Sequence, residues 1–525
     1  MFRLNPIQLA HWSRDRQFLL RAAAFLTVGS VVIAFIVSLC SPLSSGKEAE
    51  IAMIKSIING EETGKTLSRN EWITFLRTGS RSGPVPRDCR GIVTRLHTVP
   101  SEPNEFENLS EQEAEPLALY ERGLRLGEPD TAITGLKSLP AGLRYRNEFL
   151  GDLCFLSGDL DRARSHYLEE ASQHSDTRYS RRSAVVMAWR LVDRKMMKTL
   201  LADPSFRNEF SPGEQLHLFT DARDFRGLAG AVYRYETIQF RSPGFLPAVF
   251  TAAIWFLILM PFWQVTKQRL AVSALAFTAG ILSAAATIFA VLIQERIQGF
   301  HHNPVDSPLN QFIYFVAGVS LREETLKLLF FVPFAIWSAH RKSMLEALIL
   351  ASLVGLGFAF KENISYFESG IVSFTAWMRF LTANVLHFSL TGISGYYLAR
   401  MIRYKFHGME TFLFSFIAVV LAHGVYNSII AIPSLSSYEP LTTIFVAAMA
   451  YQFFDPLRDN MDTYGIRQRI SPLGVFVLGA SLLACGLMIT TSWVTPFRFA
   501  LGIFASSVAS LIPLAFAYIS RFRDL

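Results

Sequence analysis

The sequence has few charged residues for its length. Only 18% of its 525 residues are Asp, Glu, Lys or Arg, whereas 51% are hydrophobic and 13% are aromatic. A soluble chain of this length needs more charge to cover its surface, so the composition favours a membrane protein. The net charge of +7 is compatible with nucleic-acid binding. The basic residues, however, stand in short clusters between apolar runs, which is a topology pattern and predicts no nucleic-acid partner.

Cysteine is also scarce, and its spacing excludes the common metal-binding patterns. The four cysteines form no CxxC pair and no finger-type motif. The HExxH motif of many zinc peptidases is absent as well. Cys89 and Cys154 can form a disulfide if their region lies in an oxidising compartment, and two unpaired thiols are the alternative.

The first apolar run, residues 19–40, follows a basic segment at residues 1–18. It is longer than the apolar core of a signal peptide and has no small-residue cleavage site. We therefore predict that residues 19–40 are a transmembrane anchor and that residues 1–18 lie in the cytosol.

Residues 41–241 contain no run long enough to span a membrane and show the pattern of short amphipathic helices. The segment 127–132 is echoed by 158–163 at an offset of about 31 residues, near the length of helical solenoid repeats. The region near 117–175 resembles a tetratricopeptide repeat, with an irregular helical domain as the alternative. The pattern predicts an inserted α-helical, tetratricopeptide-like domain.

From residue 242 to residue 525 apolar runs dominate, which predicts a multi-span domain. Nearly all of these runs can cross about 30 Å of hydrocarbon as a helix, and 439–454 is the shortest. With the anchor they predict an all-α polytopic membrane bundle of about ten spans. The predicted spans are 19–40, 244–263, 270–293, 311–338, 345–365, 380–399, 411–431, 439–454, 472–490 and 499–519.

Basic residues are concentrated in alternate connecting segments. The positive-inside rule then places both termini in the cytosol and residues 41–241 on the extracytoplasmic side of the cell (inner) membrane. The basic set comprises Lys267, Arg269, Arg341, Lys342, Arg400, Arg403, Lys405, Arg458, Arg467, Arg469, Arg521 and Arg523.

Polar residues gather within four consecutive predicted spans, between residues 311 and 431. A charged side chain near the bilayer centre costs about 3 kcal/mol, so such residues usually face a cavity or a partner. Lys327 lies three and four residues after two glutamates, so either carboxylate can reach it on one helix face. Asn384, His387 and Thr391 form a single stripe. Lys361 is interpreted as snorkelling or pairing locally. The candidate site residues are Glu323, Glu324, Lys327, Glu362, His387, His423 and Asn427.

Carboxylates and imidazoles that converge in a cavity of low dielectric constant suit the activation of water, here in the outer half of the membrane. One glutamate can act as the base while the other pairs with Lys327, and the spacing leaves open which does which. His423 with Asn427 can donate to a developing oxyanion. Alternatively, His387, His423 and Glu362 can bind a divalent metal such as zinc, with a glutamate as base.

Four ordered motifs match a known family. They are EETLK at 323–327, GLGFAFKENISY at 355–366, His387 with its downstream glycines, and HGVYN at 423–427. Over residues 311–431 the chain resembles the PrsW family of intramembrane peptidases, which is related to the CAAX prenyl protease and Abi membrane proteins. The resemblance implies a membrane endopeptidase that uses the paired glutamates and both histidines. The catalytic type of that family has been described both as glutamate-dependent and as metal-dependent.

The resemblance also bears on partners. The best-known role in the family is cleavage of a membrane-anchored anti-sigma factor, which implies a membrane-anchored protein substrate. The large domain at 41–241 lies outside the family pattern, and it can recruit a protein substrate or regulator. A proton- or ion-coupled transporter is the main alternative, because buried Glu, Lys and His also mark ion paths. Against it, the span block shows no internal repeat between its halves.

Overall fold

The computed structural model shows a helical protein and describes residues 6–40, 110–126, 129–242, 244–262, 266–303, 305–370, 374–438, 441–463, 470–494 and 497–522. Every regular element within these ranges is a helix, which confirms the predicted all-α class. The chain divides into two compact units. One comprises Met1–Ser41 with Val232–Leu525, and the other comprises Pro42–Ala231.

The first of these, the membrane unit, contains the apolar helices. Within the described residues, six helices are long and apolar enough to cross a membrane, which identifies a multi-pass membrane protein. The predicted count of about ten spans stays a prediction. The six spans are Arg16–Leu39 in α2 (Arg16–Cys40), Phe245–Phe262 in α15 (Phe245–Leu259) with η3 (Met260–Phe262), Lys267–Glu295 in α16 (Lys267–Leu292) with η4 (Ile293–Ile297), Met344–Phe367 in α19 (Met344–Gly370), Met409–Ala431 in α21 (Met409–Ala431), and Pro472–Ser492 in α23 (Pro472–Val494).

Further long helices complete the membrane unit. They are α18 (Leu321–His340), α20 (Phe374–Arg403), α22 (Leu441–Thr463) and α24 (Phe497–Phe522). Charged residues in its first two turns lower the hydropathy of α18: Arg322, Glu323, Glu324 and Lys327. The short α17 (Pro308–Ile313) and the π-helical η5 (Tyr314–Ser320) lead directly into α18. π-Helical turns are often found at functional sites.

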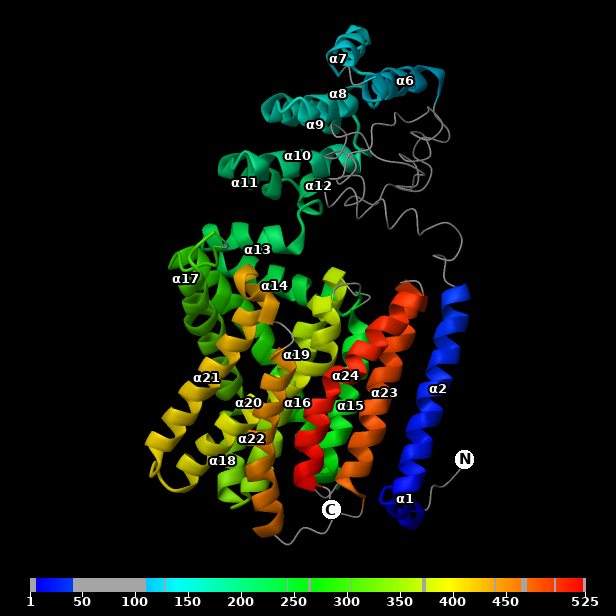
Figure 1. Cartoon of the computed structure of the whole chain (residues 1–525). Helices are drawn as coiled ribbons and strands as arrows, with labels where there is room; N and C mark the ends of the chain where they lie inside the picture. Colours follow the sequence, from blue (N-terminus) through cyan, green and yellow to red (C-terminus); the bar gives the residue numbers. More distant parts are fainter. Residues whose placement is uncertain are drawn as a thin grey trace. The chain divides into compact units, whose positions relative to one another are not determined.

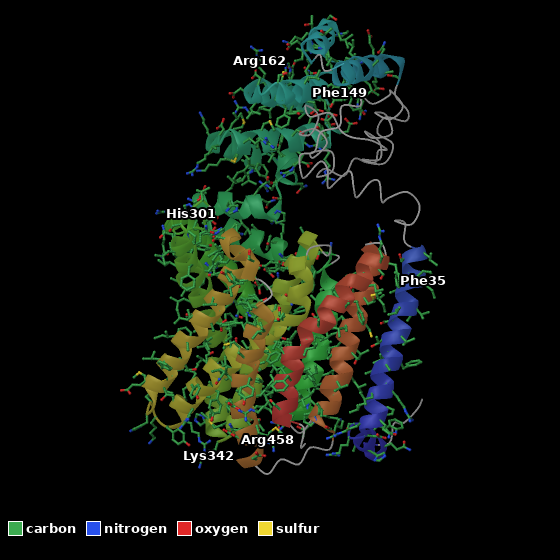
Figure 2. The ribbon with its side chains drawn as sticks, viewed as in Figure 1. Phe35, Phe149, Arg162, His301, Lys342 and Arg458 are labelled. Atoms are coloured by element: carbon green, nitrogen blue, oxygen red, sulfur yellow. The ribbon has the colours of Figure 1, made fainter. Side chains whose placement is uncertain are left out.

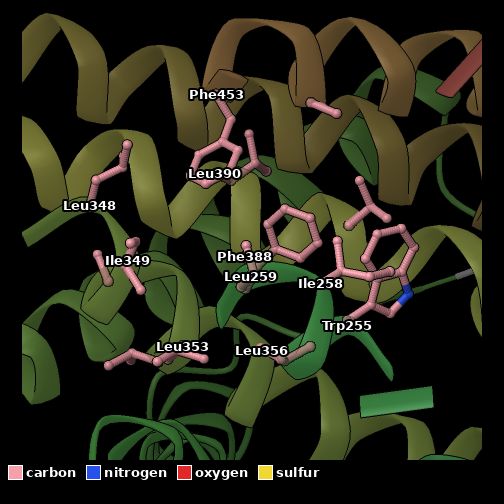
Figure 3. Packing of buried hydrophobic residues seen from close by; sticks show 14 of the residues in the cluster. Trp255, Ile258, Leu259, Leu348, Ile349, Leu353, Leu356, Phe388, Leu390 and Phe453 are labelled. Carbon is pink, nitrogen blue, oxygen red and sulfur yellow. The ribbon is translucent and has the colours of Figure 1, made fainter. Parts of the chain in front are cut away.

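Helix α19 is the centre of the membrane unit. Leu348, Leu353 and Leu356 along it have no exposed surface, and the helix packs against α15, α16 and α20. Figure 3 shows this core from close by, with Trp255 of α15 and Phe388 of α20 among the leucines of α19. Because residues 344–361 of α19 are all buried, polar groups among them must find partners inside the protein.

The two ends of the membrane unit differ in the residues they carry. Helix α1 (Pro6–Trp12) and the last turns of α24 lie at the same end of the bundle, and α2 lies at its edge beside α23 (Figure 1). Lys342 and Arg458, two members of the basic set, lie at that end too, whereas His301 lies at the opposite end (Figure 2). This arrangement agrees with the alternation on which the predicted topology depends.

The unit Pro42–Ala231 is built from short helices that follow one another as hairpins. Their bounds are α6 (Glu111–Leu126), α7 (Pro129–Ser138), α8 (Arg146–Leu156), α9 (Leu160–Gln173), α10 (Arg178–Arg190), α11 (Arg194–Ala202), α12 (Pro204–Arg207), α13 (Pro212–Asp221) and α14 (Phe225–Gln239). The last of these helices, α14, continues from this unit into the membrane unit.

One turn recurs between the helices of these hairpins. Before α9, α11 and α14, a residue with positive φ is followed by an aspartate whose side chain accepts a backbone N–H of the next helix, at 2.9 to 3.1 Å. Such a side chain caps the helix N-terminus. The pairs are Gly158-Asp159, Val192-Asp193 and Arg223-Asp224.

The recurring turn supports a repeated helical hairpin, but a tetratricopeptide identity stays a prediction. The segment 127–132 of the predicted repeat lies partly outside the described residues. Cys89, and with it the predicted choice between a disulfide and free thiols, lies wholly outside them.

Candidate active site

Glu324, in the first turn of α18, contacts residues of three helices and links the candidate site residues into one cluster. Its side chain has no exposed surface. Its Oε1 accepts hydrogen bonds from Lys327 Nζ at 2.7 Å and from His423 Nδ1 at 2.9 Å. Its Oε2 accepts the hydroxyl of Thr391 at 3.4 Å. Three helices, α18, α20 and α21, therefore meet at one carboxylate.

Lys327 connects Glu324 to the histidine of α20. Its ammonium lies 2.8 Å from His387 Nδ1 and 4.0 Å from the centre of the Phe358 ring. Because an ammonium only donates, Nδ1 of His387 accepts, and the ring proton is on Nε2. That Nε2–H donates to Glu362 Oε2 at 2.9 Å. The chain of contacts from Glu324 to Glu362 thus fixes the His387 tautomer and its ring orientation.

Glu323 differs from its neighbour in having one oxygen that makes only long ion-pair contacts within the described residues. The residue is 8% exposed, and its buried Oε2 has no hydrogen-bond partner among the described residues. This oxygen lies 3.8 Å from His423 Nε2 and 4.0 Å from Lys327 Nζ. Nδ1 of His423 donates to Glu324, because an ionised carboxylate only accepts. The other ring nitrogen of His423, Nε2, faces Glu323. Glu323 Oε2 and His423 Nε2 therefore face each other at 3.8 Å, without a hydrogen bond between them.

Two glycines allow the helices to approach closely at these groups. A side chain at Gly355 of α19 would collide with the backbone carbonyl oxygen of His387. A side chain at Gly424, directly after His423, would collide with Val316 in η5. Small residues at helix crossings let membrane helices pack backbone to backbone. The glycines of the sequence motifs thus help to place both imidazoles.

The structure brings six of the seven candidate residues into contact. The exception is Asn427, which is half-buried and makes no hydrogen bond to the cluster within the described residues. Thr391 and Phe358 contact the cluster but were not assigned to the site from the sequence. The signal for Thr391 was its place on the stripe with His387. The signal for Phe358 was its place one turn before Glu362.

A candidate metal-binding set differs from the predicted one. Glu324, His387 and His423 each offer a ligand atom, and these atoms lie within 4.8 Å of one another. The predicted set had Glu362 in place of Glu324. In the structure, Glu362 Oε2 accepts from Nε2 of His387, whereas Lys327 contacts the other ring nitrogen, Nδ1. Carboxylate oxygen and imidazole nitrogen are common zinc ligands, so the donor set fits a divalent cation. The Lys327 ammonium, in contact with two of the three groups, is the cation that competes for them.

A multi-pass helical bundle with carboxylates, imidazoles and an ammonium buried together indicates a functional membrane site rather than an inert scaffold, because burying such groups without a use is costly. Residues 268–453 match the model of a family described as PrsW family intramembrane metalloprotease. Over this range the chain is similar to that family, and the protein is a membrane peptidase. No curated protein and no solved structure matches the chain.

The match confirms the resemblance drawn from the four motifs and extends beyond 311–431 on both sides. It also means that the transporter alternative is not favoured. All the candidate residues lie within the matched range.

Proposed function

We propose that the protein is an intramembrane endopeptidase in which Glu323 activates the water that attacks a peptide bond of a membrane-anchored protein. The observation that carries the proposal is the buried Oε2 of Glu323, which has no hydrogen-bond partner among the described residues and lies 3.8 Å from His423 Nε2. A general base needs a free basic atom within reach of the reacting water. Glu324 does not meet this requirement, because both of its oxygens are engaged.

In this mechanism Glu323 takes a proton from water while the water oxygen bonds to the scissile carbonyl carbon. The carbonyl oxygen gains negative charge, and a protonated His423 donates to it from Nε2. Glu324 stabilises that imidazolium through Nδ1. When the C–N bond breaks, Glu323 returns its proton to the departing amine.

The remaining candidates position these groups. Lys327 neutralises Glu324, and Glu362 holds His387 in the tautomer that accepts from Lys327. Asn427 lies one helical turn from His423, so it is proposed as a second donor to the oxyanion once substrate is bound.

A metal-assisted variant uses the same residues. Glu324, His387 and His423 would hold a divalent ion such as zinc, which lowers the pKa of a bound water and polarises a carbonyl. Lys327 would then have to give up its contacts with two of these groups. The glutamate mechanism needs no such rearrangement, and for that reason it is the one proposed.

We further propose that the site opens toward the extracytoplasmic side of the cell membrane, with both termini in the cytosol. The substrate would be a single-span protein, of which a membrane-anchored anti-sigma factor is one type. The helical-hairpin unit would recruit the substrate or a regulator on the outer side.

The experiment reconstitutes the purified full-length protein in liposomes with a library of single-span proteins and compares wild type with Glu323→Gln. Removal of a general base typically lowers the rate by about 10²- to 10⁴-fold. We expect a loss of that size, with substrate binding retained. Glu410→Gln, at an exposed position on α21, is the matched control and should cleave like wild type.

Two outcomes would count against the proposal. Cleavage that survives Glu323→Gln removes Glu323 from the role of base. Ion flux without any cleavage favours the transporter. Metal content is measured on the same preparations: about one zinc per chain, lost in His423→Ala together with activity, would establish the metal-assisted variant instead.

A further inference from the structure

Lys361 is a buried cation outside the cluster. It is 4% exposed, although it lies within the apolar span of α19. Its ammonium forms an ion pair with Glu236 Oε2 at 3.0 Å and donates to the side-chain oxygen of Gln239. The sequence left two interpretations of Lys361, snorkelling or a local pair. Its charge is paired inside the protein, so it does not snorkel, and its partners are distant in sequence.

Both partners lie on the last turns of α14, the helix that connects the helical hairpins to the first span of the block. These turns belong to the membrane unit, which begins again at Val232. Gln239 is 5% exposed and the Glu236 side chain is 13% exposed, so little of the contact is open to solvent. Solvent screens a buried charge pair poorly. Such a pair offsets the cost of desolvation only if its two partners keep close, well-aligned positions.

Lys361 directly precedes Glu362 on α19. The carboxylate of Glu362 fixes the His387 ring, and His387 contacts Lys327. A shift or rotation of α19 at Lys361 would move Glu362 with it, because adjacent residues share one rigid helical backbone. A small displacement of a catalytic constellation is enough to lower the rate substantially.

We infer that Lys361 is a positioning residue: its contacts with Glu236 and Gln239 tie α14 to α19 and thereby hold Glu362 against His387. The inference rests on the proposed function for its effect on catalysis. It also gives α14 a role, because a change in the last turns of this helix is transmitted to the site through Lys361.

The first test needs no substrate. Hydrogen–deuterium exchange is measured on the purified full-length protein for wild type, Lys361→Met and Lys361→Arg. We expect Lys361→Met to raise exchange several-fold at residues 358–367 of α19, with little change at residues 344–352. Lys361→Arg keeps the charge and should restore most of the protection.

An ion pair at the other end of the same helix provides the control. Arg341 pairs with Glu346, which is 1% exposed, at 3.2 Å. Arg341→Met should loosen residues 344–352 and leave residues 358–367 and cleavage unchanged. Equal exchange at residues 358–367 in wild type and Lys361→Met would overturn the inference, whether or not a substrate has been found.

The second test uses any substrate that the wild type cleaves. We expect Lys361→Met to lower kcat about 10-fold with KM nearly unchanged. A double-mutant cycle with Glu362→Gln then separates positioning from general destabilisation. If Lys361 acts through Glu362, adding Lys361→Met to Glu362→Gln has little further effect. Losses that multiply in the double variant would contradict the inference, and a wild type without activity would count against the proposed function alone.

Discussion

At the scale of single residues, two adjacent glutamates have opposite surroundings. Glu324 is held by an ammonium, an imidazole and a hydroxyl, whereas Glu323 keeps one oxygen without a hydrogen-bond partner among the described residues. Successive helical residues point about 100° apart, so identical side chains can meet different neighbours. On this difference rests the proposal that one carboxylate is structural and the other acts in the chemistry.

This difference predicts that the two variants lose unequal amounts of stability. Glu324→Gln removes the counter-ion nearest to Lys327, at 2.7 Å, and leaves only Glu323 at 4.0 Å. Breaking such a buried pair should cost about 3–5 kcal/mol. Glu323→Gln breaks no hydrogen bond made by Oε2, and its cost should stay below about 1 kcal/mol. Reversible unfolding of the full-length protein in mixed micelles measures both values. Equal destabilisation by the two variants would show that Glu323 is also a structural partner.

Part of this site could be predicted from the sequence. Helical spacing placed both glutamates within reach of Lys327, and the confinement of polar residues to neighbouring spans predicted that they meet. Spacing could not distinguish Glu323 from Glu324, because the distinction depends on His423 and Thr391, which belong to other helices. The Lys361 contact was missed for the same reason, since α14 lies outside the block of predicted spans.

At the scale of elements, the repeated turn of the helical hairpins explains why only a weak repeat was visible in the sequence. Gly158 is a recognisable signal for positive φ, but Val192 and Arg223 adopt the same conformation without being glycine. What repeats is the backbone turn with its aspartate cap, and residue identity at the strained position varies. Pattern matching on glycine therefore found one turn and missed the next two.

The strained turn at Val192 predicts a stabilising substitution. A β-branched residue at φ 53° is disfavoured, by about 1–2 kcal/mol relative to the ordinary region. Val192 is 68% exposed, so little packing is lost on truncation. Val192→Gly should stabilise α10 and α11 by about 1 kcal/mol, measured as slower hydrogen–deuterium exchange of these helices. Lys195→Gly, within α11, is the control and should destabilise by about 1 kcal/mol. Faster exchange in Val192→Gly would show that the turn is not strained.

At the scale of the whole molecule, the distribution of charge predicts which parts face the cytosol. Lys342 and Arg458 lie at one end of the membrane unit and His301 lies at the other. In a variant without native cysteines, Lys342→Cys should react with a membrane-impermeant maleimide only after the cells are opened. His301→Cys and Arg162→Cys should react in intact cells whose outer barrier is permeabilised. Labelling of Lys342→Cys from outside would contradict the predicted topology and would mean that the helical hairpins lie in the cytosol.

The contacts of α18 have a consequence for how the chain is made. Its charged residues disfavour insertion as an isolated helix. Their partners, His387 on α20 and His423 on α21, leave the ribosome only after α18 has been synthesised. Since α18 is a predicted span, we expect its stable entry into the lipid to wait for the helices that follow it, and a nascent chain ending before α21 to hold an incomplete, poorly inserted site. On this expectation, the cluster that is proposed to cut a substrate also completes the membrane integration of its own helix during biogenesis.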